Sequence, residues 1–93
     1  MRVDSAEQQK RLVHEVRPLY PDVARQAGIE GTVEMRILID KDGKVENVRP
    51  ISGERVLLDA AMDAVRQWRY RPMELEGKPV PVMTLVSVEF KLQ

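Results

Sequence analysis

The sequence predicts a single α+β domain, a two-layer sandwich in which two helices cover one face of a three-stranded antiparallel sheet. Its 93 residues are enough for one small domain and too few for two. Long segments near the middle and the end alternate apolar and polar residues, as half-buried strands do, and between them apolar residues recur at helical spacing. Helices packed on one face of a sheet are the compact arrangement that such elements form.

Residues 1–15 are expected to form a flexible or extended N-terminal segment, and residues 16–93 the folded domain. Residues 1–10 are polar and weakly periodic, although Asp4 and Glu7 have a spacing that resembles a capping box and favours a short helix. Leu12, Val13 and Val16 then indicate an extended, partly buried lead-in to the domain.

A short helix is predicted over residues 21–27. Pro21 suits the first helical turn, where its missing N–H costs nothing. Gly28 suits the left-handed residue that follows a last turn. With fewer than two full turns, this helix depends on packing against the rest of the domain.

The first strand is predicted over residues 32–40. It places its apolar side chains on one face: Val33, Met35, Ile37 and Ile39. A type I turn at residues 40–43 follows, because aspartate comes first and glycine last.

The second strand is predicted over residues 44–51. Its apolar spacing slips between Val45 and Val48, which indicates a bulge. Pro50 cannot donate to a ladder of hydrogen bonds, so this strand should lie at an edge of the sheet.

The main helix is predicted over residues 56–70, with Pro72 ending it. Its apolar side chains recur every three or four positions: Leu57, Leu58, Ala61, Val65 and Trp68. Trp68 is therefore assigned to the core, whereas Tyr70 lies one position past the apolar stripe and is not assigned. The arginines at positions 66, 69 and 71 suit a helix C-terminus; the alternative is a basic patch for an acidic partner or for glycan strands.

The last strand is predicted over residues 82–92, after a loop at residues 76–79. The core-facing side chains should be Val82, Thr84, Val86, Val88 and Phe90, with Met83, Leu85, Ser87, Glu89 and Lys91 pointing the other way. If this strand pairs with the first one across a right-handed crossover, the order in the sheet is second, first, last. The last strand then occupies an edge.

Composition and motifs argue against an enzyme, a metal site, a cofactor and a nucleic-acid partner. The 15 basic and 15 acidic side chains cancel, whereas nucleic-acid binders usually carry a basic excess. There is no cysteine, and His14, the only histidine, has only Glu15 beside it as a partner. The run from Asp40 to Gly43 lacks the further ligands of a calcium loop, and no glycine-rich phosphate motif occurs.

The last strand is the candidate binding site, because its middle carries none of the charges or prolines that usually protect a sheet edge. An extended peptide could add to this edge as a further strand. The alternative is that another chain or the N-terminal segment covers it. The candidate partner-binding residues are Val82, Met83, Thr84, Leu85, Val86, Ser87, Val88, Glu89 and Phe90.

Four short segments occur in an order that resembles the TonB C-terminal domain family of Gram-negative bacteria, over about residues 16–92. They are Tyr20-Pro21, residues 28–33 (GIEGTV), residues 40–45 (DKDGKV) and residues 66–72 (RQWRYRP). The resemblance implies structural roles, without partner contact, for Tyr20, Pro21, Gly31, Gly43, Trp68, Tyr70 and Pro72. Two departures are that Gly28 stands where some relatives have a larger polar residue, and that the chain stops at Gln93, where some relatives continue.

The resemblance also implies a binding module of an energy transducer. In the family, a proton-driven motor complex of the inner membrane acts through this domain, which grips the Ton box of an outer-membrane transporter by β-strand addition. On this sequence, residues 82–90 would receive that extended segment, and pulling on it would serve nutrient uptake such as iron–siderophore transport. The alternative with the same fold is a TolA-like envelope scaffold or a signalling-receptor tail.

TonB proteins reach the periplasm through an N-terminal membrane helix and a proline-rich spacer, and neither occurs in these 93 residues. No apolar run approaches the roughly 20 residues that span a bilayer. We therefore expect a periplasmic domain excised from an inner-membrane-anchored protein, with Met1 supplied for expression. A lightly protected last strand can also pair with its copy in a second molecule, so a homodimer is a further expectation.

Overall fold

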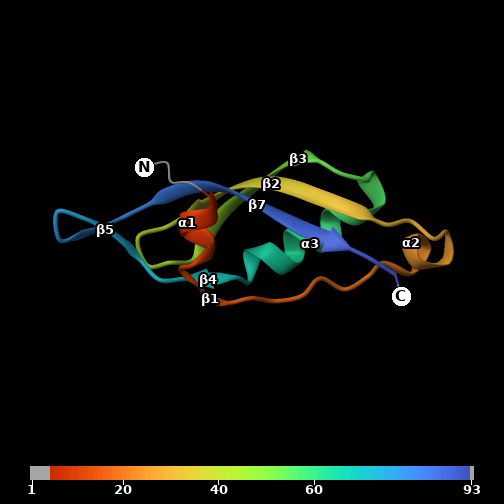
Figure 1. Ribbon diagram of the computed structural model, residues 1–93, viewed down its shortest axis with the longest axis horizontal. Helices are drawn as coiled ribbons and strands as arrows, with labels where there is room; N and C mark the ends of the chain where they lie inside the picture. Colours follow the sequence, from red (N-terminus) through yellow and green to blue (C-terminus); the bar gives the residue numbers. More distant parts are fainter. Residues whose placement is uncertain (1–4, 93) are drawn as a thin grey trace.

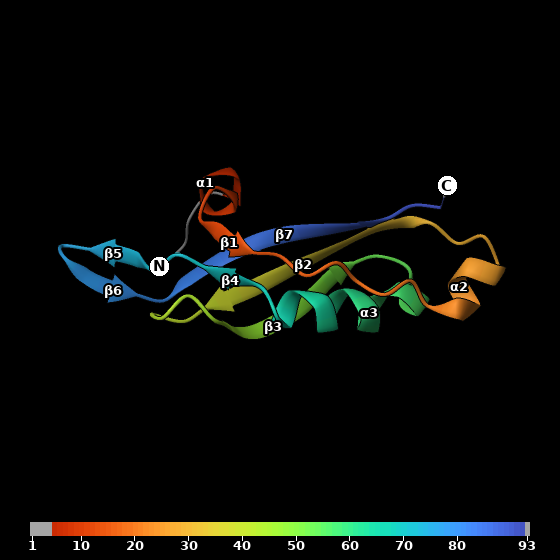
Figure 2. The ribbon, with the colours of Figure 1, turned by 90° about the horizontal axis from the view of Figure 1, so that it is seen from below.

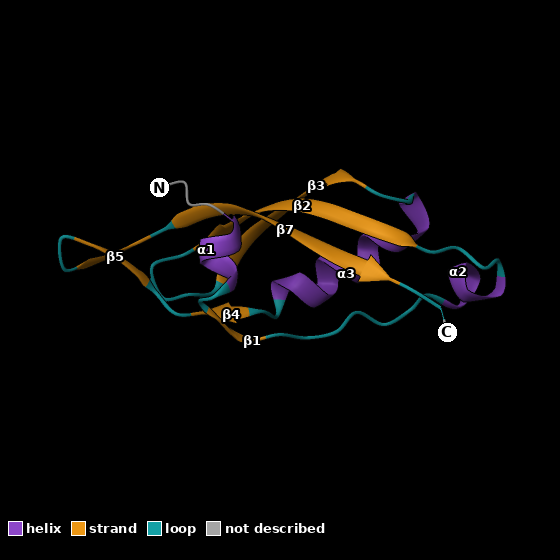
Figure 3. Ribbon diagram, in the orientation of Figure 1, coloured by secondary structure: helices purple, strands orange, loops and turns teal. Residues whose placement is uncertain are grey.

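The computed structural model describes residues 5–92, which form an elongated α+β domain (Figure 1). Its elements are α1 (Ser5–Gln9), β1 (Leu12–His14), α2 (Asp22–Gln26), β2 (Gly31–Ile39), β3 (Val45–Ser52), α3 (Arg55–Arg66), β4 (Arg69–Tyr70), β5 (Met73–Leu75), β6 (Lys78–Val80) and β7 (Val82–Phe90). The longest connection without regular structure runs from β1 to α2 (Figure 3).

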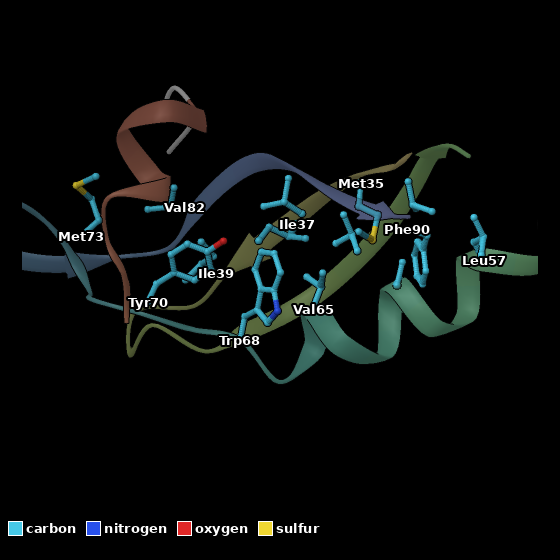
Figure 4. Packing of buried hydrophobic residues seen from close by; sticks show 14 of the residues in the cluster. Met35, Ile37, Ile39, Leu57, Val65, Trp68, Tyr70, Met73, Val82 and Phe90 are labelled. Atoms are coloured by element: carbon cyan, nitrogen blue, oxygen red, sulfur yellow. The ribbon is translucent and has the colours of Figure 1, made fainter. Parts of the chain in front are cut away.

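The main sheet has the order β3-β2-β7, with both pairings antiparallel, so the predicted order is confirmed. Met35, in the central strand, lies opposite Pro50 on one side and Val86 on the other. The predicted alternation is also confirmed, because every second side chain of β2 and β7 is buried. These side chains and one face of α3 form the core shown in Figure 4.

Strand β3 lies at an edge, as Pro50 predicts, and carries the expected bulge. Leu38 faces Asn47 and Ile39 faces Val45, so Glu46 is the extra residue. A second irregularity adjoins Pro50, which has no N–H to give to the ladder.

Helix α3 begins at Arg55, one residue before the predicted start, but the predicted end at residue 70 is wrong. Gln67 caps the helix, and the N–H of Trp68 donates to the carbonyl of Val65 in a final tight turn. The chain then extends into β4, which pairs with β1. Trp68 and Tyr70 are both buried, so the pattern of buried side chains continues past residue 66 although the backbone is no longer helical there.

Helix α2 matches the predicted short helix within one residue at each end. Gly28 adopts the left-handed conformation expected after the last turn, with φ of 70°. The helix contacts α3 at one end of the molecule and places Ala24 in the core (Figure 2). The α+β class predicted from the sequence is thereby confirmed.

A hairpin of β5 and β6 projects at the opposite end of the molecule, where only a loop had been predicted (Figure 2). Glu76 and Gly77 form its two-residue turn, and both have positive φ. Strands of three residues are too short to show a clear alternation, and Pro79 in β6 also argues against a strand.

Residues 5–14 pack back on the domain as α1 and β1. Strand β1 pairs with β4, and the N–H of Arg71 donates to the carbonyl of Arg11 at 2.7 Å. The short helix expected near Glu7 is present as α1, which contacts β7. Asp4, its expected capping residue, lies outside the described residues.

Candidate functional site

Strand β7 lies at an edge of the main sheet, and within residues 5–92 no strand pairs with its other side. Its nine residues alternate regularly between buried and exposed side chains. Met83 and Leu85 are the large apolar side chains on the exposed face, with 38% and 42% of their surface accessible. The core-facing side chains hold the strand in place and leave its outer edge for a partner.

Helix α1 lies near the first half of β7 (Figures 1 and 2). The helix contacts β7, and in Figure 2 strand β7 lies between α1 and β2. Gln8 of α1 has only 1% of its surface exposed. The N-terminal segment therefore packs against the last strand through α1.

Along its second half, β7 borders an open groove of about 360 Å³. The opposite wall is the lead-in between β1 and α2. The lining side chains come from both walls and include Glu15, Arg17, Pro18, Tyr20, Trp68, Ser87 and Phe90. An extended segment beside β7 would lie in this groove.

Tyr20 holds the end of β7 against the lead-in. Its ring meets that of Phe90 edge-on, with the centroids 5.5 Å apart, and the guanidinium of Arg25 lies 5.8 Å from the centre of the Tyr20 ring. The Tyr20 hydroxyl donates to the carbonyl of Ile29. Desolvation, followed by the negative charge of Glu30, raises the pKa of Tyr20, so the phenol stays a neutral donor.

Trp68 anchors the other part of the lead-in, since its indole N–H donates to the carbonyl of Val16 at 2.9 Å. Tyr20 and Trp68 thus fix the walls of the groove, and their side chains make these contacts within the domain. Pro21 is extended and stands immediately before α2 as its N-cap.

Gly43, Tyr70 and Pro72 meet at the opposite end of the sheet. The N–H of Tyr70 donates to the carbonyl of Gly43 at 2.8 Å. A Cβ atom on Gly43 would lie 1.9 Å from the Tyr70 carbonyl oxygen and 3.7 Å from Cδ of Pro72. Gly43 has φ of 88°, so both conformation and close approach require glycine here. Gly31 has no such requirement, because a Cβ there would make only ordinary contacts with Glu54 and Leu57.

The Tyr70 ring is buried, and its hydroxyl has no hydrogen-bond partner among the described residues. Burial, followed by the charge of Glu15, raises the pKa of Tyr70 well above its ordinary value. This tyrosine serves as a core side chain.

The described residues contain no group of three or more His, Cys, Asp or Glu side chains placed to hold a metal ion. His14 is exposed. Two of the three arginines proposed as a basic patch are engaged at the end of α3. Arg66 pairs with Asp63 at 2.9 Å, and Arg69 donates to the carbonyls of Arg66 and Trp68. Across residues 5–92, no helix has both the length and the apolar character needed to cross a membrane.

Sequence reasoning missed two parts of this site. Gln8 is a polar residue in a polar segment, and nothing in the sequence signals its burial. Glu15 and Arg17 line the groove because the lead-in runs beside β7, which depends on the Trp68 and Tyr20 anchors described above.

Comparison with known proteins gives a consistent result. The family model described as the Gram-negative bacterial TonB protein C-terminal matches residues 16–92. The chain is 37% identical to the TonB protein of Vibrio cholerae over 81 residues, covering 85% of this chain and 33% of that protein. It is 36% identical to the TonB protein of Xanthomonas campestris over 77 residues, covering 81% and 34%. The chain thus spans about a third of the length of these relatives.

Two solved structures are similar in fold. The solution structure of the TonB C-terminal domain of Pseudomonas aeruginosa has a TM-score of 0.74 and 26% identity, covering 89% of this chain and 86% of that chain. The TonB2 protein of Vibrio anguillarum has a TM-score of 0.66 and 32% identity, covering 92% and 84%.

Proposed function

This chain belongs to the Gram-negative bacterial TonB C-terminal family, and we propose that it is the periplasmic binding module of a TonB-type energy transducer. In this proposal it grips the Ton box of an outer-membrane transporter by strand addition to β7. It then transmits a pull that is driven by the proton-motive force, for uptake of nutrients such as iron–siderophores. No catalytic activity is proposed.

The observation that carries this proposal is the position of β7. It is a nine-residue strand at a sheet edge, held from behind by buried side chains, with a groove along its second half. Strand addition uses main-chain hydrogen bonds for affinity and alternate side chains for specificity. An added strand would place every second side chain beside the exposed Leu85 and Ser87.

Strand addition also suits repeated cycles of grip and release. Each ladder hydrogen bond contributes about 1 kcal/mol net, so a short added strand binds with at best micromolar affinity. A pull along the strand loads all the hydrogen bonds together. The paired strands therefore resist a larger force than when the bonds are opened one by one. Single-molecule force spectroscopy checks this point, which fails if rupture is as easy in shear as in peeling.

The remaining partners belong to the same proposal. The chain covers about a third of its relatives, so the inner-membrane anchor and the contact with the motor proteins would lie in other parts of the full-length protein. Residues 16–93 would form the binding domain, and residues 1–15 an N-terminal segment whose described part, α1 and β1, packs against that domain. Pairing of β7 with its copy in a second molecule would give a homodimer that competes with the transporter.

The test is an NMR amide titration of the monomeric ¹⁵N-labelled chain with a seven-residue Ton-box-like peptide. We expect shifts concentrated at residues 82–90, with β3, at the opposite edge, as the internal control. The same peptide with alternate amides N-methylated should not bind, because it cannot complete the ladder. Absence of shifts at millimolar peptide would refute the proposal and favour the envelope-scaffold alternative.

A further inference from the structure

We propose that the face of the main sheet away from α3 is a second docking surface, which binds a protein segment that carries a carboxylate beside apolar side chains. Arg36 and Arg49 would hold the carboxylate, and Leu38 and Met83 would contact the apolar part. We call this surface the open face. It differs from the β7 edge because it uses side chains that project from the sheet, whereas the edge uses main-chain hydrogen bonds. The inference therefore does not depend on strand addition to β7.

The first argument is that the sheet brings these four side chains together. Every second residue of β2 is buried in the core with α3, so Arg36 and Leu38 project from the other face. Arg36 lies directly opposite Arg49 of β3, and Leu38 lies directly opposite Met83 of β7. The side chains of directly opposed residues lie on the same face of a sheet. A groove of about 250 Å³ has all four residues in its lining, together with Asn47.

The second argument is that the two arginines have no acidic partner. Both are exposed, and neither guanidinium group makes a hydrogen bond or an ion pair with another residue of the described chain. Glu34 lies on the same face, two residues along β2, but pairs with neither of them. Like charges directly opposite each other on neighbouring strands destabilise a sheet. A carboxylate placed between Arg36 and Arg49 would offset this repulsion and accept charge-assisted hydrogen bonds from both.

The third argument is that exposed apolar side chains adjoin the arginines. Met83 and Leu85 are large apolar residues with exposed side chains, and Leu85 lies directly opposite Arg36. Methionine and arginine are enriched where proteins bind proteins, compared with the rest of the surface. The open face thus has a cationic part and an apolar part side by side. This combination fits a short protein segment in which an acidic residue has apolar neighbours.

An anionic membrane surface and a free phosphate ion fit the open face less well. Glu34 and Glu89 are exposed on the same face, and both would be repelled by a surface of uniform negative charge. A free phosphate would pair with the arginines but would leave Met83 and Leu85 uncovered. A protein segment can place one carboxylate at the arginines and keep its other side chains uncharged.

The test is an NMR titration of the ¹⁵N-labelled chain, followed through the side-chain N–H signals of Arg36 and Arg49. The probe is a capped seven-residue peptide in which glutamates alternate with leucines. Alternate amides of the probe are N-methylated, so that it cannot complete a ladder with β7. We expect these signals to shift, and a twin peptide with glutamine in place of glutamate to bind on the order of tenfold more weakly. Absence of shifts at millimolar probe, or equal affinity for the two peptides, would overturn the inference.

Matched variants separate the open face from general attraction between charges. Arg36→Gln and Arg49→Gln should each weaken binding of the glutamate probe by on the order of tenfold. Arg55→Gln makes the same change in net charge at an exposed arginine of α3, and it should leave the affinity within about twofold. The double variant Arg36→Glu/Arg49→Glu should instead bind a probe with lysine in place of glutamate. An equal loss of affinity in Arg55→Gln would overturn the inference.

Two further measurements decide what the arginines serve. The urea midpoint of Arg36→Gln should equal or exceed that of the unchanged chain, because a cross-strand repulsion is removed. A clearly lower midpoint would show that the arginine stabilises the sheet, and would overturn the inference. Inorganic phosphate and vesicles of phosphatidylglycerol are the competing ligands. If either one shifts the Arg36 and Arg49 signals while the glutamate probe does not, the surface binds that ligand and the inference is wrong.

Discussion

Replacing Gly43 by alanine should destabilise the domain far more than the same replacement at Gly77. Both glycines have positive φ, 88° and 81°, so both variants bear the conformational penalty of about 1–2 kcal/mol for an L-residue. At Gly77 a Cβ would have no atom within 4 Å. At Gly43 it would lie 1.9 Å from the Tyr70 carbonyl oxygen, which is backbone and cannot rotate away.

To relieve this collision, the β2–β3 turn and β4 must separate by at least about 1 Å, until the Cβ and the carbonyl oxygen reach an ordinary contact distance. That movement breaks the 2.8 Å hydrogen bond from the N–H of Tyr70 to Gly43, which contributes about 1 kcal/mol. Together with strain and lost packing around Tyr70, we expect Gly43→Ala to cost about 3–5 kcal/mol, a large part of the 5–15 kcal/mol typical of domains.

Urea denaturation followed by the fluorescence of Trp68, the only tryptophan, measures the difference. With a slope near 1 kcal/mol per molar urea, the midpoint of Gly43→Ala should lie roughly 2 M below that of Gly77→Ala. Equal midpoints for the two variants would refute the argument that close approach, and not φ alone, selects glycine at position 43.

Two further predictions concern the aromatic residues after α3. Trp68→Phe removes the indole N–H that donates to Val16 and should lower the free energy of unfolding by about 2 kcal/mol. Amide hydrogen exchange in the lead-in should become faster, because the lead-in loses this anchor. Unchanged exchange there would contradict the prediction. Tyr70→Phe removes a buried hydroxyl without a partner among the described residues and should leave stability at pH 7 unchanged or up to about 1 kcal/mol higher. Burial raises the pKa of Tyr70 in the folded protein above the value of 10.0 expected in the unfolded chain. The contribution of the Tyr70 phenol to the free energy of unfolding is therefore fully present below pH 10.0 and is lost as the pH rises above it. Urea midpoints at pH 8 and 11 should therefore fall less for Tyr70→Phe than for the unchanged chain, and an equal fall would contradict the assignment.

The sheet could be predicted from the sequence because its pattern is local. Alternation in β2 and β7 identified the buried face of each strand, and Pro50 placed β3 at an edge. The end of α3 could not be predicted in this way. Trp68 and Tyr70 are buried whether the backbone is helical or extended, so periodicity alone does not distinguish the two, and the pairing of β4 with β1 decides.

The candidate edge could be predicted, but the packing of α1 against β7 could not. The prediction of an edge strand required only the order of elements. The docking of α1 depends on how β1 pairs with β4, which turns residues 5–10 back towards β7. The β5–β6 hairpin was missed for a local reason. Its strands have only three residues each, and Glu76 is a non-glycine residue with positive φ in a turn that carries only one glycine.

The order of the main sheet has a consequence for folding. Strands β2 and β3 are joined by a short turn and can pair as soon as both are synthesised, whereas Met35 meets Val86 about fifty residues later in the chain. Pairings of such long range form slowly, because the intervening chain must first be ordered. Until β7 arrives, the central strand β2 is itself an open edge with apolar side chains, and a β7 strand from a neighbouring molecule can fill the vacancy as well as its own. If such swapping occurs during refolding, its extent would depend on how fast residues 82–90 reach β2 compared with the concentration of other copies.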